Sequence, residues 1–219
     1  MIFPLLYPVF LAGILLAGQT ENGQDRIFEE KAREILEEAS ALIQSHESLY
    51  IGFDYTVHDP RNENGVQDKG VLYTRGDQYY MQLGSHYFIS DGETAWVFME
   101  EFNEVHISLA EDAGETVTPG SLLQNVADRF QSKWIREETI DGRSVHIIDM
   151  VPTEPQPFFK YRLAIEDAGK QLLYTEAHDR QGGIYRYDIR DYEPDPDLPE
   201  DRFVFDPDLY PGIEVIDLR

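Results

Sequence analysis

The sequence predicts an α+β protein, mainly β, in which a curved antiparallel sheet forms an unclosed half-barrel covered by helices. Apolar residues recur with a helical period in two segments and with a two-residue period in many short stretches between turn residues. These segments follow the order helix, strands, helix, strands. Because strands and helices do not alternate, the order argues against a Rossmann-type or other parallel sheet.

The first helix is expected over residues 26–45, where apolar residues fall at steps of three and four: Phe28, Ala32, Ile35, Ala39 and Leu42. We expect this apolar face to pack on a sheet. A second helix is expected over residues 118–130. Thr118 is suited to its N-cap, and Pro119 is suited to its first helical position.

The strand pattern begins at residues 49–57, which place Ile51 and Phe53 on one face. Residues 59–68 are rich in turn formers and predict a loop. Further short strands are expected before and after the second helix: 70–75, 78–83, 87–90, 94–99 and 104–108, then 134–138, 145–152, 161–166, 172–179, 184–192 and 203–206. The tail, residues 210–219, is suited to one last strand.

The composition narrows the classes of protein to which the chain can belong. It has 219 residues with 42 Asp and Glu against 18 Lys and Arg, a net charge of -24. Such a surface repels phosphate backbones, so we expect no nucleic-acid partner. The absence of cysteine excludes disulfides, thiolate nucleophiles and a lipidated N-terminal cysteine. The small number of Lys is typical of proteins that work in high salt, although a very acidic ordinary protein remains the alternative.

The N-terminal segment resembles an export signal. Residues 1–20 carry no charged side chain, and an apolar run over residues 10–17 precedes small residues suited to cleavage. We therefore expect residues 1–18 to be a cleaved signal peptide, residues 19–25 a linker and residues 26–219 a single periplasmic domain. The competing interpretation is a membrane anchor.

The sequence contains no motif for catalysis, so we expect neither enzyme activity nor a cofactor. It has no nucleophile elbow, zinc-protease motif, P-loop or dinucleotide fingerprint. The six His are scattered, and no metal site is expected. The acidic stretch over residues 193–201 has clustered oxygens, but its prolines and the absence of EF-hand spacing favour a solvated loop over a calcium site.

Several motifs together resemble the LolA family of periplasmic outer-membrane lipoprotein carriers. Residues 90–98 (SDGETAWVF) are similar to the S-D-G-x-T-x-W strand entry of that family. Similar motifs follow in the family's order: GVLYTR at 70–75, Thr-Pro at 118–119, the strand at 145–152, and FVFDP with PGIEV at 203–207 and 211–215.

The resemblance implies an unclosed barrel lidded by helices that carries lipoprotein acyl chains from an inner-membrane exporter to an outer-membrane receptor. It favours the soluble carrier, because the related receptor needs a lipidated cysteine. We expect a monomer. Alternatives are a carrier of another lipid, a β-rich envelope interaction protein with a filled core, and a hydrolase with a concealed site.

The many aromatic residues fit either an ordinary core or a cavity, and the resemblance favours the cavity. We expect nine residues to line it: Ile51, Phe53, Tyr79, Met81, Trp96, Phe98, Leu122, Val126 and Phe130. The strand parity stays open, because a slip of one residue turns the other face inward. The resemblance also places Arg75 at a strand end as a latch that reaches the lid helices, with a solvent-facing Arg75 as the alternative.

Overall fold

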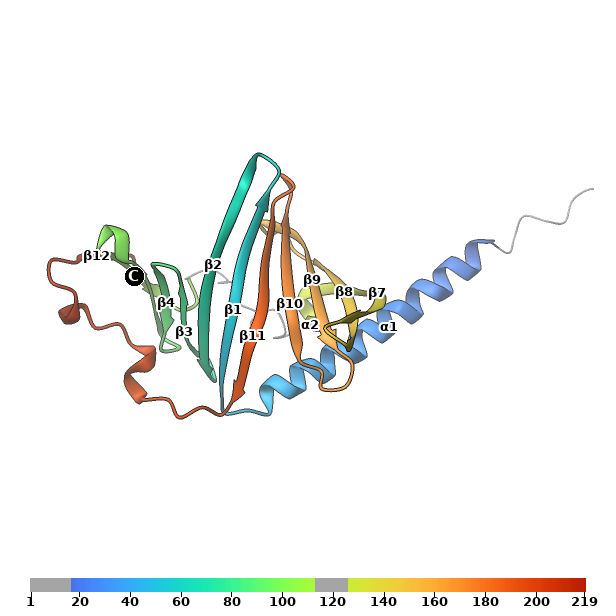
Figure 1. The fold of residues 1–219 in the computed structure, drawn as a ribbon, viewed down its shortest axis with the longest axis horizontal. Coiled ribbons are helices and arrows are strands. Elements are labelled where there is room, and N and C mark those ends of the chain that lie inside the picture. The colour runs from blue at the N-terminus through green and yellow to red at the C-terminus, as the bar shows by residue number, and fades with distance from the viewer. Residues whose placement is uncertain (1–16, 113–125) are drawn as a thin grey trace, which may run out of the picture.

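The computed structural model describes residues 17–112 and 126–219, and expectations that fall on residues 1–16 and 113–125 lie outside this range. A single twelve-stranded sheet dominates the fold (Figure 1). The helices are α1 (Ala17–Gln44) and α2 (Val126–Arg129), with short 3₁₀ turns at Glu100–Phe102, Glu200–Phe203 and Pro207–Leu209. The strands are β1 (Ser48–Asp59), β2 (Asn62–Arg75), β3 (Gln78–Leu83), β4 (His86–Ser90), β5 (Thr94–Met99), β6 (Glu104–Leu109), β7 (Phe130–Ile140), β8 (Arg143–Pro152), β9 (Phe158–Glu166), β10 (Leu172–Asp179), β11 (Ile184–Pro194) and β12 (Glu214–Asp217).

The sheet is open, as predicted. Its strand order is β12-β6-β5-β4-β3-β2-β1-β11-β10-β9-β8-β7, so β12 and β7 end the sheet and do not pair with each other. All neighbours are antiparallel except β12 and β6, which are parallel. The meander needs sharp turns, and Gly76 takes a φ of 56° between β2 and β3, a region that favours glycine.

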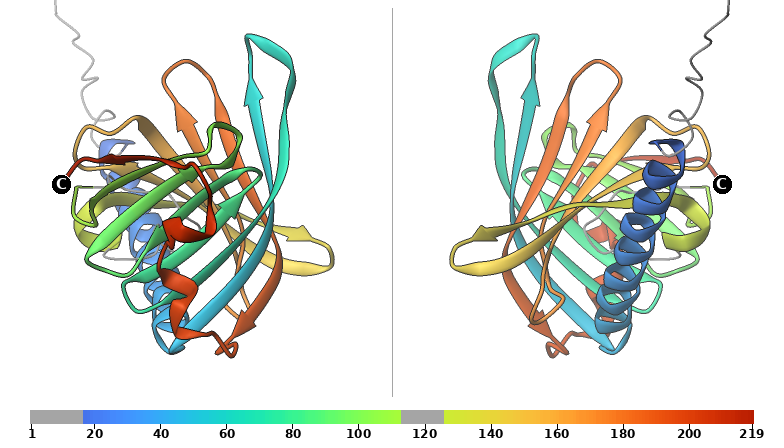
Figure 2. Two further views of the ribbon diagram at one scale, coloured as in Figure 1. Left: turned by 90° about the vertical axis from the view of Figure 1, so that its left-hand side faces the viewer. Right: turned by 90° about the vertical axis from the view of Figure 1, so that its right-hand side faces the viewer.

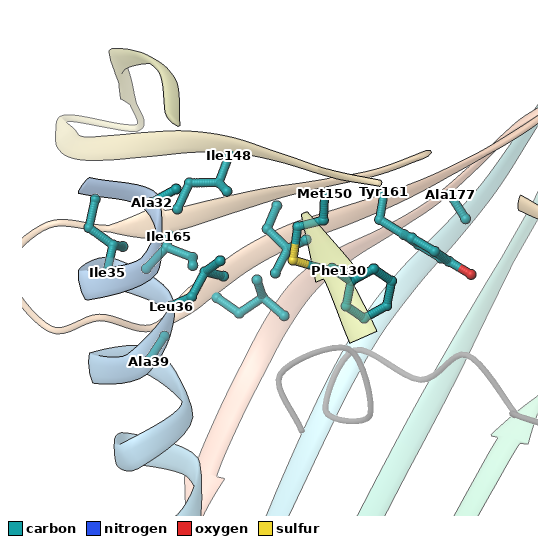
Figure 3. Close-up of a cluster of buried hydrophobic side chains, with 12 residues drawn as sticks. Ala32, Ile35, Leu36, Ala39, Phe130, Ile148, Met150, Tyr161, Ile165 and Ala177 are labelled. Atoms are coloured by element: carbon teal, nitrogen blue, oxygen red, sulfur yellow. The ribbon is translucent and has the colours of Figure 1, made fainter. Parts of the chain in front are cut away.

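Helix α1 packs on the concave face of the sheet over β7 to β10 (Figures 2 and 3). Three residues of its predicted apolar face, Ala32, Ile35 and Ala39, are at most 5% exposed, and the buried face also includes Leu36, which was not predicted. Phe28 and Leu42 are half-buried. Figure 3 shows the buried side chains of α1 directed at Ile148, Met150 and Ile165 of the sheet. The helix begins at Ala17 and therefore includes residues 19–25, which the sequence had suggested as a linker.

The C-terminal tail covers the opposite, convex face at the other end of the sheet. In Figure 2 the tail lies in front of β3 to β6 in one view, and α1 lies in front in the other. Phe205 and Tyr210 pack on Phe98 of β5, with ring centroids 5.2 and 4.4 Å away. The predicted last strand is present as β12, which hides the edge of β6.

Three local expectations need correction or lie partly outside the described residues. Residues 62–68 belong to strand β2 and form the outer end of the β1–β2 hairpin, and the turn is confined to the residues between Asp59 and Asn62. The strand expected at 203–206 is wrong, because Phe203 ends a 3₁₀ turn and Phe205 packs into the cluster beneath the tail. Of the helix expected at 118–130, the described part is α2, and Phe130 already belongs to β7.

Candidate functional site: the concave apolar face

A second apolar cluster lies on the concave face beside the one that α1 covers. Its buried members are Leu49, Ile51, Phe53, Leu72 and Met81, each at most 3% exposed. Cross-strand pairing brings them together, because Ile51 opposes Leu72 and Leu72 opposes Met81. Half-buried side chains surround them: Tyr55, Tyr79, Leu83, Phe88, Tyr187, Ile189 and Tyr192. All of these residues come from strands.

Aromatic contacts continue the apolar surface from this cluster toward α1. Tyr187 packs on Phe53 and Tyr55, with ring centroids 5.3 and 4.9 Å away. Two strands further on, Phe158 contacts Tyr185 at 5.1 Å and Tyr161 at 5.9 Å. The concave face is therefore apolar across both halves of the sheet.

The tyrosine hydroxyls on this face add no charge near neutral pH. Burial raises the pKa of Tyr55 to about 12, with a smaller contribution from Tyr185. Burial likewise raises the pKa of Tyr187 well above its ordinary value. Both hydroxyls stay protonated, so the surface suits the hydrocarbon part of a ligand.

The structure separates the nine residues expected to line one cavity. Ile51, Phe53, Tyr79 and Met81 share the concave cluster. Phe130 and Val126 also face this side, within the cluster under α1. Leu122 lies outside the described residues.

Trp96 and Phe98 project from the convex face, which corrects their expected place beside Ile51. Trp96 opposes Ile89, which opposes Tyr80, whereas the concave residue Met81 opposes Phe88. Trp96 and Phe98 instead belong to the cluster beneath the C-terminal tail.

Sequence reasoning missed several concave residues that the strand period could have supplied. From Tyr79 and Met81 the two-residue step leads to Leu83, and the β3–β4 register leads on to Phe88. On β11 the same step gives Tyr185 and Tyr187.

A groove of about 950 Å³ runs between α1, α2 and the start of β7. Its apolar lining includes Leu36, Ala41, Val126 and Phe130, among the described residues. Charged and polar side chains of α1 form much of the remainder, including Arg26, Glu30, Arg33, Glu37 and Gln44. The volume is at the upper end of the range of about 300–1,000 Å³ that is usual for small-molecule sites.

Arg75, expected to latch the lid helices, contacts the tail. Its guanidinium donates to the Leu198 carbonyl at 2.8 Å and lies 5.4 Å from the Phe203 ring centroid. Its strand neighbour on the same face, Tyr73, receives Arg202 of the tail over its ring at 4.8 Å. These contacts of Arg75 are therefore on the face opposite α1.

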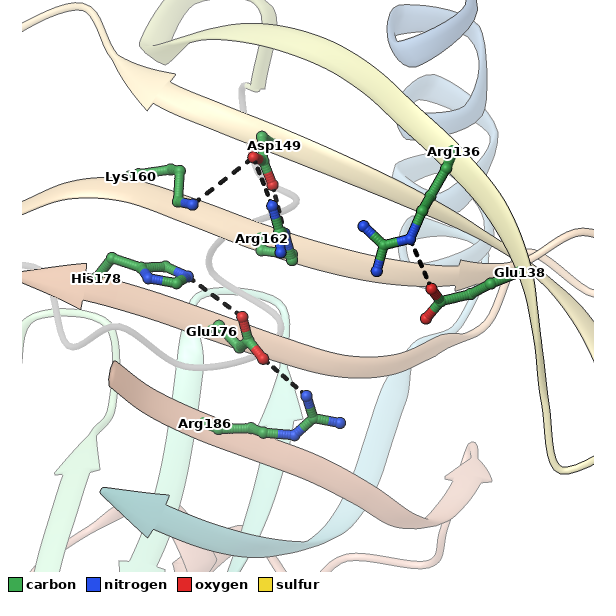
Figure 4. A network of polar contacts seen from close by, with 8 residues as sticks. All are labelled: Arg136, Glu138, Asp149, Lys160, Arg162, Glu176, His178 and Arg186. Carbon is green, nitrogen blue, oxygen red and sulfur yellow. Dashed lines mark hydrogen bonds and ion pairs between the residues drawn. The ribbon is translucent and has the colours of Figure 1, made fainter. Parts of the chain in front are cut away.

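The convex face over β7 to β11 carries a ladder of ion pairs (Figure 4). Beside the ladder lies a buried apolar cluster of Val145, Ile147, Ala164, Leu173 and Tyr174. Arg162 donates two hydrogen bonds to Asp149, at 2.6 and 2.8 Å. Arg186 binds Glu176 at 2.7 Å and lies 3.7 Å from the centroid of Tyr174. The hydrogen bonds to Asp149 hold the pKa of Arg162 above its ordinary value.

The described residues hold neither a membrane-spanning helix nor a candidate metal site. Within residues 17–112 and 126–219 no helix is long and apolar enough to cross a membrane. The same part of the chain contains no group of three His, Asp or Glu side chains placed to hold a metal ion.

Comparison with known proteins establishes the fold. No protein-family model and no curated protein matches the chain. A solved structure of an uncharacterized conserved protein from Thermus thermophilus has a TM-score of 0.59 at 12% identity, over 85% of this chain and 99% of that one. The two proteins therefore share a fold, an open antiparallel sheet with a helix on its concave face. This is the fold that the resemblance to the LolA family implies.

Two further structures are similar at lower scores. A LolA superfamily protein from Nitrosomonas europaea has a TM-score of 0.44 at 15% identity, over 80% of this chain and 97% of that one. LprF from Mycobacterium bovis has a TM-score of 0.47 at 14% identity, over 78% of this chain and 97% of that one.

Proposed function

We propose that the chain is a noncatalytic periplasmic carrier that binds the acyl chains of lipoproteins on its concave face. One observation carries the proposal: within residues 17–112 and 126–219, the members of the second concave cluster all come from strands, whereas the first cluster is packed against α1. Each CH₂ of an acyl chain that stays in water costs about 0.8 kcal/mol of free energy relative to burial in an apolar environment. A carrier needs a large apolar surface that is not already used to hold its own fold together.

The direction of transport and the partners rest on the motifs that resemble the LolA family. An inner-membrane exporter would load the carrier, and an outer-membrane receptor would unload it. The net charge of -24 disfavours direct docking on anionic lipid, which favours handover between proteins. The groove beside α1 offers polar side chains to the glyceryl and peptide parts of a lipoprotein.

Mass spectrometry of lipid extracted from the protein, purified from its native envelope, tests the proposal. We expect acylated lipoprotein or its amino-terminal lipopeptide in near-stoichiometric amount. If phospholipid or free fatty acid is found in its place, the proposed acyl-binding site stands and the proposed cargo is wrong. Protein free of bound lipid that also fails to take up a diacylated lipopeptide would overturn the carrier function.

A further inference from the structure

A chain of polar contacts beneath α1 centres on a buried histidine. The Trp134 indole N–H donates to His146 Nδ1 at 3.3 Å. The other ring nitrogen, Nε2, lies 3.0 Å from Asp167 Oδ1. Lys170 then joins Asp167, at 3.1 Å, to Glu38 of α1, at 3.3 Å. The His146 side chain is only 6% exposed, so water cannot readily replace these partners.

These two contacts fix the protonation state of the imidazole. An indole nitrogen can only donate, so Nδ1 of His146 must accept with a lone pair. The Asp167 carboxylate can then be satisfied only if the proton is on Nε2. A second proton would have to bind at Nδ1, where it would face the Trp134 N–H. Two donors cannot share that contact, so protonation breaks the hydrogen bond between Trp134 and His146.

Both ends of this chain of contacts hold α1. The Trp134 ring lies 5.5 Å from the ring of Phe28 and 3.8 Å from Lys31 Nζ. At the other end, Lys170 reaches Glu38, about two turns further along the same helix. A shift of Trp134 therefore removes support from the N-terminal part of α1.

The charged groups around His146 act in both directions. Asp167 favours the imidazolium, whereas Lys170 on the same turn and Lys31 of α1 oppose it. Glu137 of β7 opposes His146 in the sheet register and accepts from Ser144 at 2.7 Å, and Glu38 of α1 is bound to Lys170. The ring's neighbour on β9, Ile165, is apolar.

We propose that His146 is the proton-sensitive centre of a clamp that holds α1 on the concave face, and that acidification releases the helix. Histidine is the side chain whose ordinary protonation falls between about pH 5 and pH 8, so acidification across this range is the condition that tests the release. The hydrogen bond from His146, with help from Lys170, holds the pKa of Asp167 below its ordinary value. Asp167 therefore stays ionised near about pH 5 and does not cause the release.

Hydrogen exchange of the cargo-free, full-length protein tests the clamp independently of the proposed function. Between about pH 7.5 and pH 5, we expect the protection factors of amides in residues 26–44 to fall roughly five- to tenfold, the effect of losing one buried hydrogen bond. In His146→Gln an amide can replace both contacts and does not titrate, so the fall should disappear. His178→Gln is the matched control, because His178 is a half-buried histidine on the convex face.

Trp134→Phe removes the indole donor and should leave α1 poorly protected at both pH values. An equal pH response in His146→Gln and the wild type would overturn the proposal. So would protection of α1 that does not change with pH in the wild type. If His146→Gln does not fold, a Trp134→Phe variant with the wild-type pH response would overturn the proposal in the same way.

Discussion

The two halves of the sheet are covered on opposite faces. Over β7 to β10 the concave face is packed against α1, and the convex face carries the ion pairs around Arg162 and Arg186. Over β3 to β6 the convex face is packed against the C-terminal tail through Phe98 and Phe205. The concave face beside it has an apolar cluster built from strands alone.

Among the described residues, this difference separates the apolar clusters that α1 and the tail cover from the concave cluster that neither of these two elements covers. Each half of the sheet needs one covered face to bury enough apolar area. Helix α1 covers one half, and the C-terminal tail covers the other. The ion-pair ladder keeps the remaining convex surface polar. The concave cluster around Phe53 and Met81 is the apolar surface that neither α1 nor the tail uses.

The largest effect is expected for Phe98→Ala, which removes the centre of the tail-covered cluster. Phe98 is 1% exposed and contacts Phe205 and Tyr210, so its loss should cost about 3–5 kcal/mol of unfolding free energy. Denaturant titration measures this loss. The affinity of the folded protein for a fatty acid should not change, and weaker binding would place the ligand on the convex side.

A smaller loss is expected for Arg162→Gln in the ion-pair ladder. It leaves Asp149, which is 19% exposed, with Lys160 at 3.7 Å as its remaining ion pair. The variant should lose about 1–3 kcal/mol of unfolding free energy. Addition of Asp149→Asn should restore part of it in a double-mutant cycle. If the double variant loses the sum of the two single-variant losses, Arg162 and Asp149 are not coupled.

Phe88→Asp should weaken acyl-chain binding by about tenfold or more, or about 1.4 kcal/mol, because a ligand would have to desolvate the new carboxylate. Tyr87→Asp is its matched control, since Tyr87 is the preceding residue of β4 and faces the tail-covered cluster. Titration calorimetry with a long-chain fatty acid measures both. Equal losses of fatty-acid affinity in the two variants would show that binding does not distinguish the concave face from the convex face.

The smallest effect is expected for Arg75→Leu. The variant loses the hydrogen bond to the Leu198 carbonyl, worth about 0.5–1.5 kcal/mol. We expect a slightly lower melting temperature with unchanged transfer of lipoprotein to the receptor. Tighter cargo binding with slower transfer would instead support the latch expected from the resemblance.

The sequence predicted the sheet well because turn residues mark its strand ends. β3, β5 and β10 have the predicted bounds, and the apolar face of α1 is the predicted one. The outer part of β2, residues 62–69, was missed, because residues 59–68 are polar and contain glycine and proline. Such residues occur in a hairpin that extends beyond the apolar clusters.

Which side chains of a strand point to the concave side was harder to predict than where the strand lies in the sequence. Alternation identifies the buried face only where the other face meets water. β4 has Phe88 on one face and Tyr87 on the other, because the tail covers its convex side. Trp96 and Phe98 were therefore assigned to the wrong face. No local pattern indicated that residues 195–219 return to cover these strands.

Quenching by a brominated acyl chain tests the central claim most directly. Tyr79 and Tyr80 are adjacent, half-buried residues of β3 that belong to the concave and convex clusters, respectively. Each is replaced by tryptophan, as Tyr79→Trp or Tyr80→Trp, in a protein carrying Trp96→Phe and Trp134→Phe. We predict strong quenching of the tryptophan at position 79 and little quenching at position 80. Equal quenching at both positions, or stronger quenching at 80, would contradict a concave acyl site.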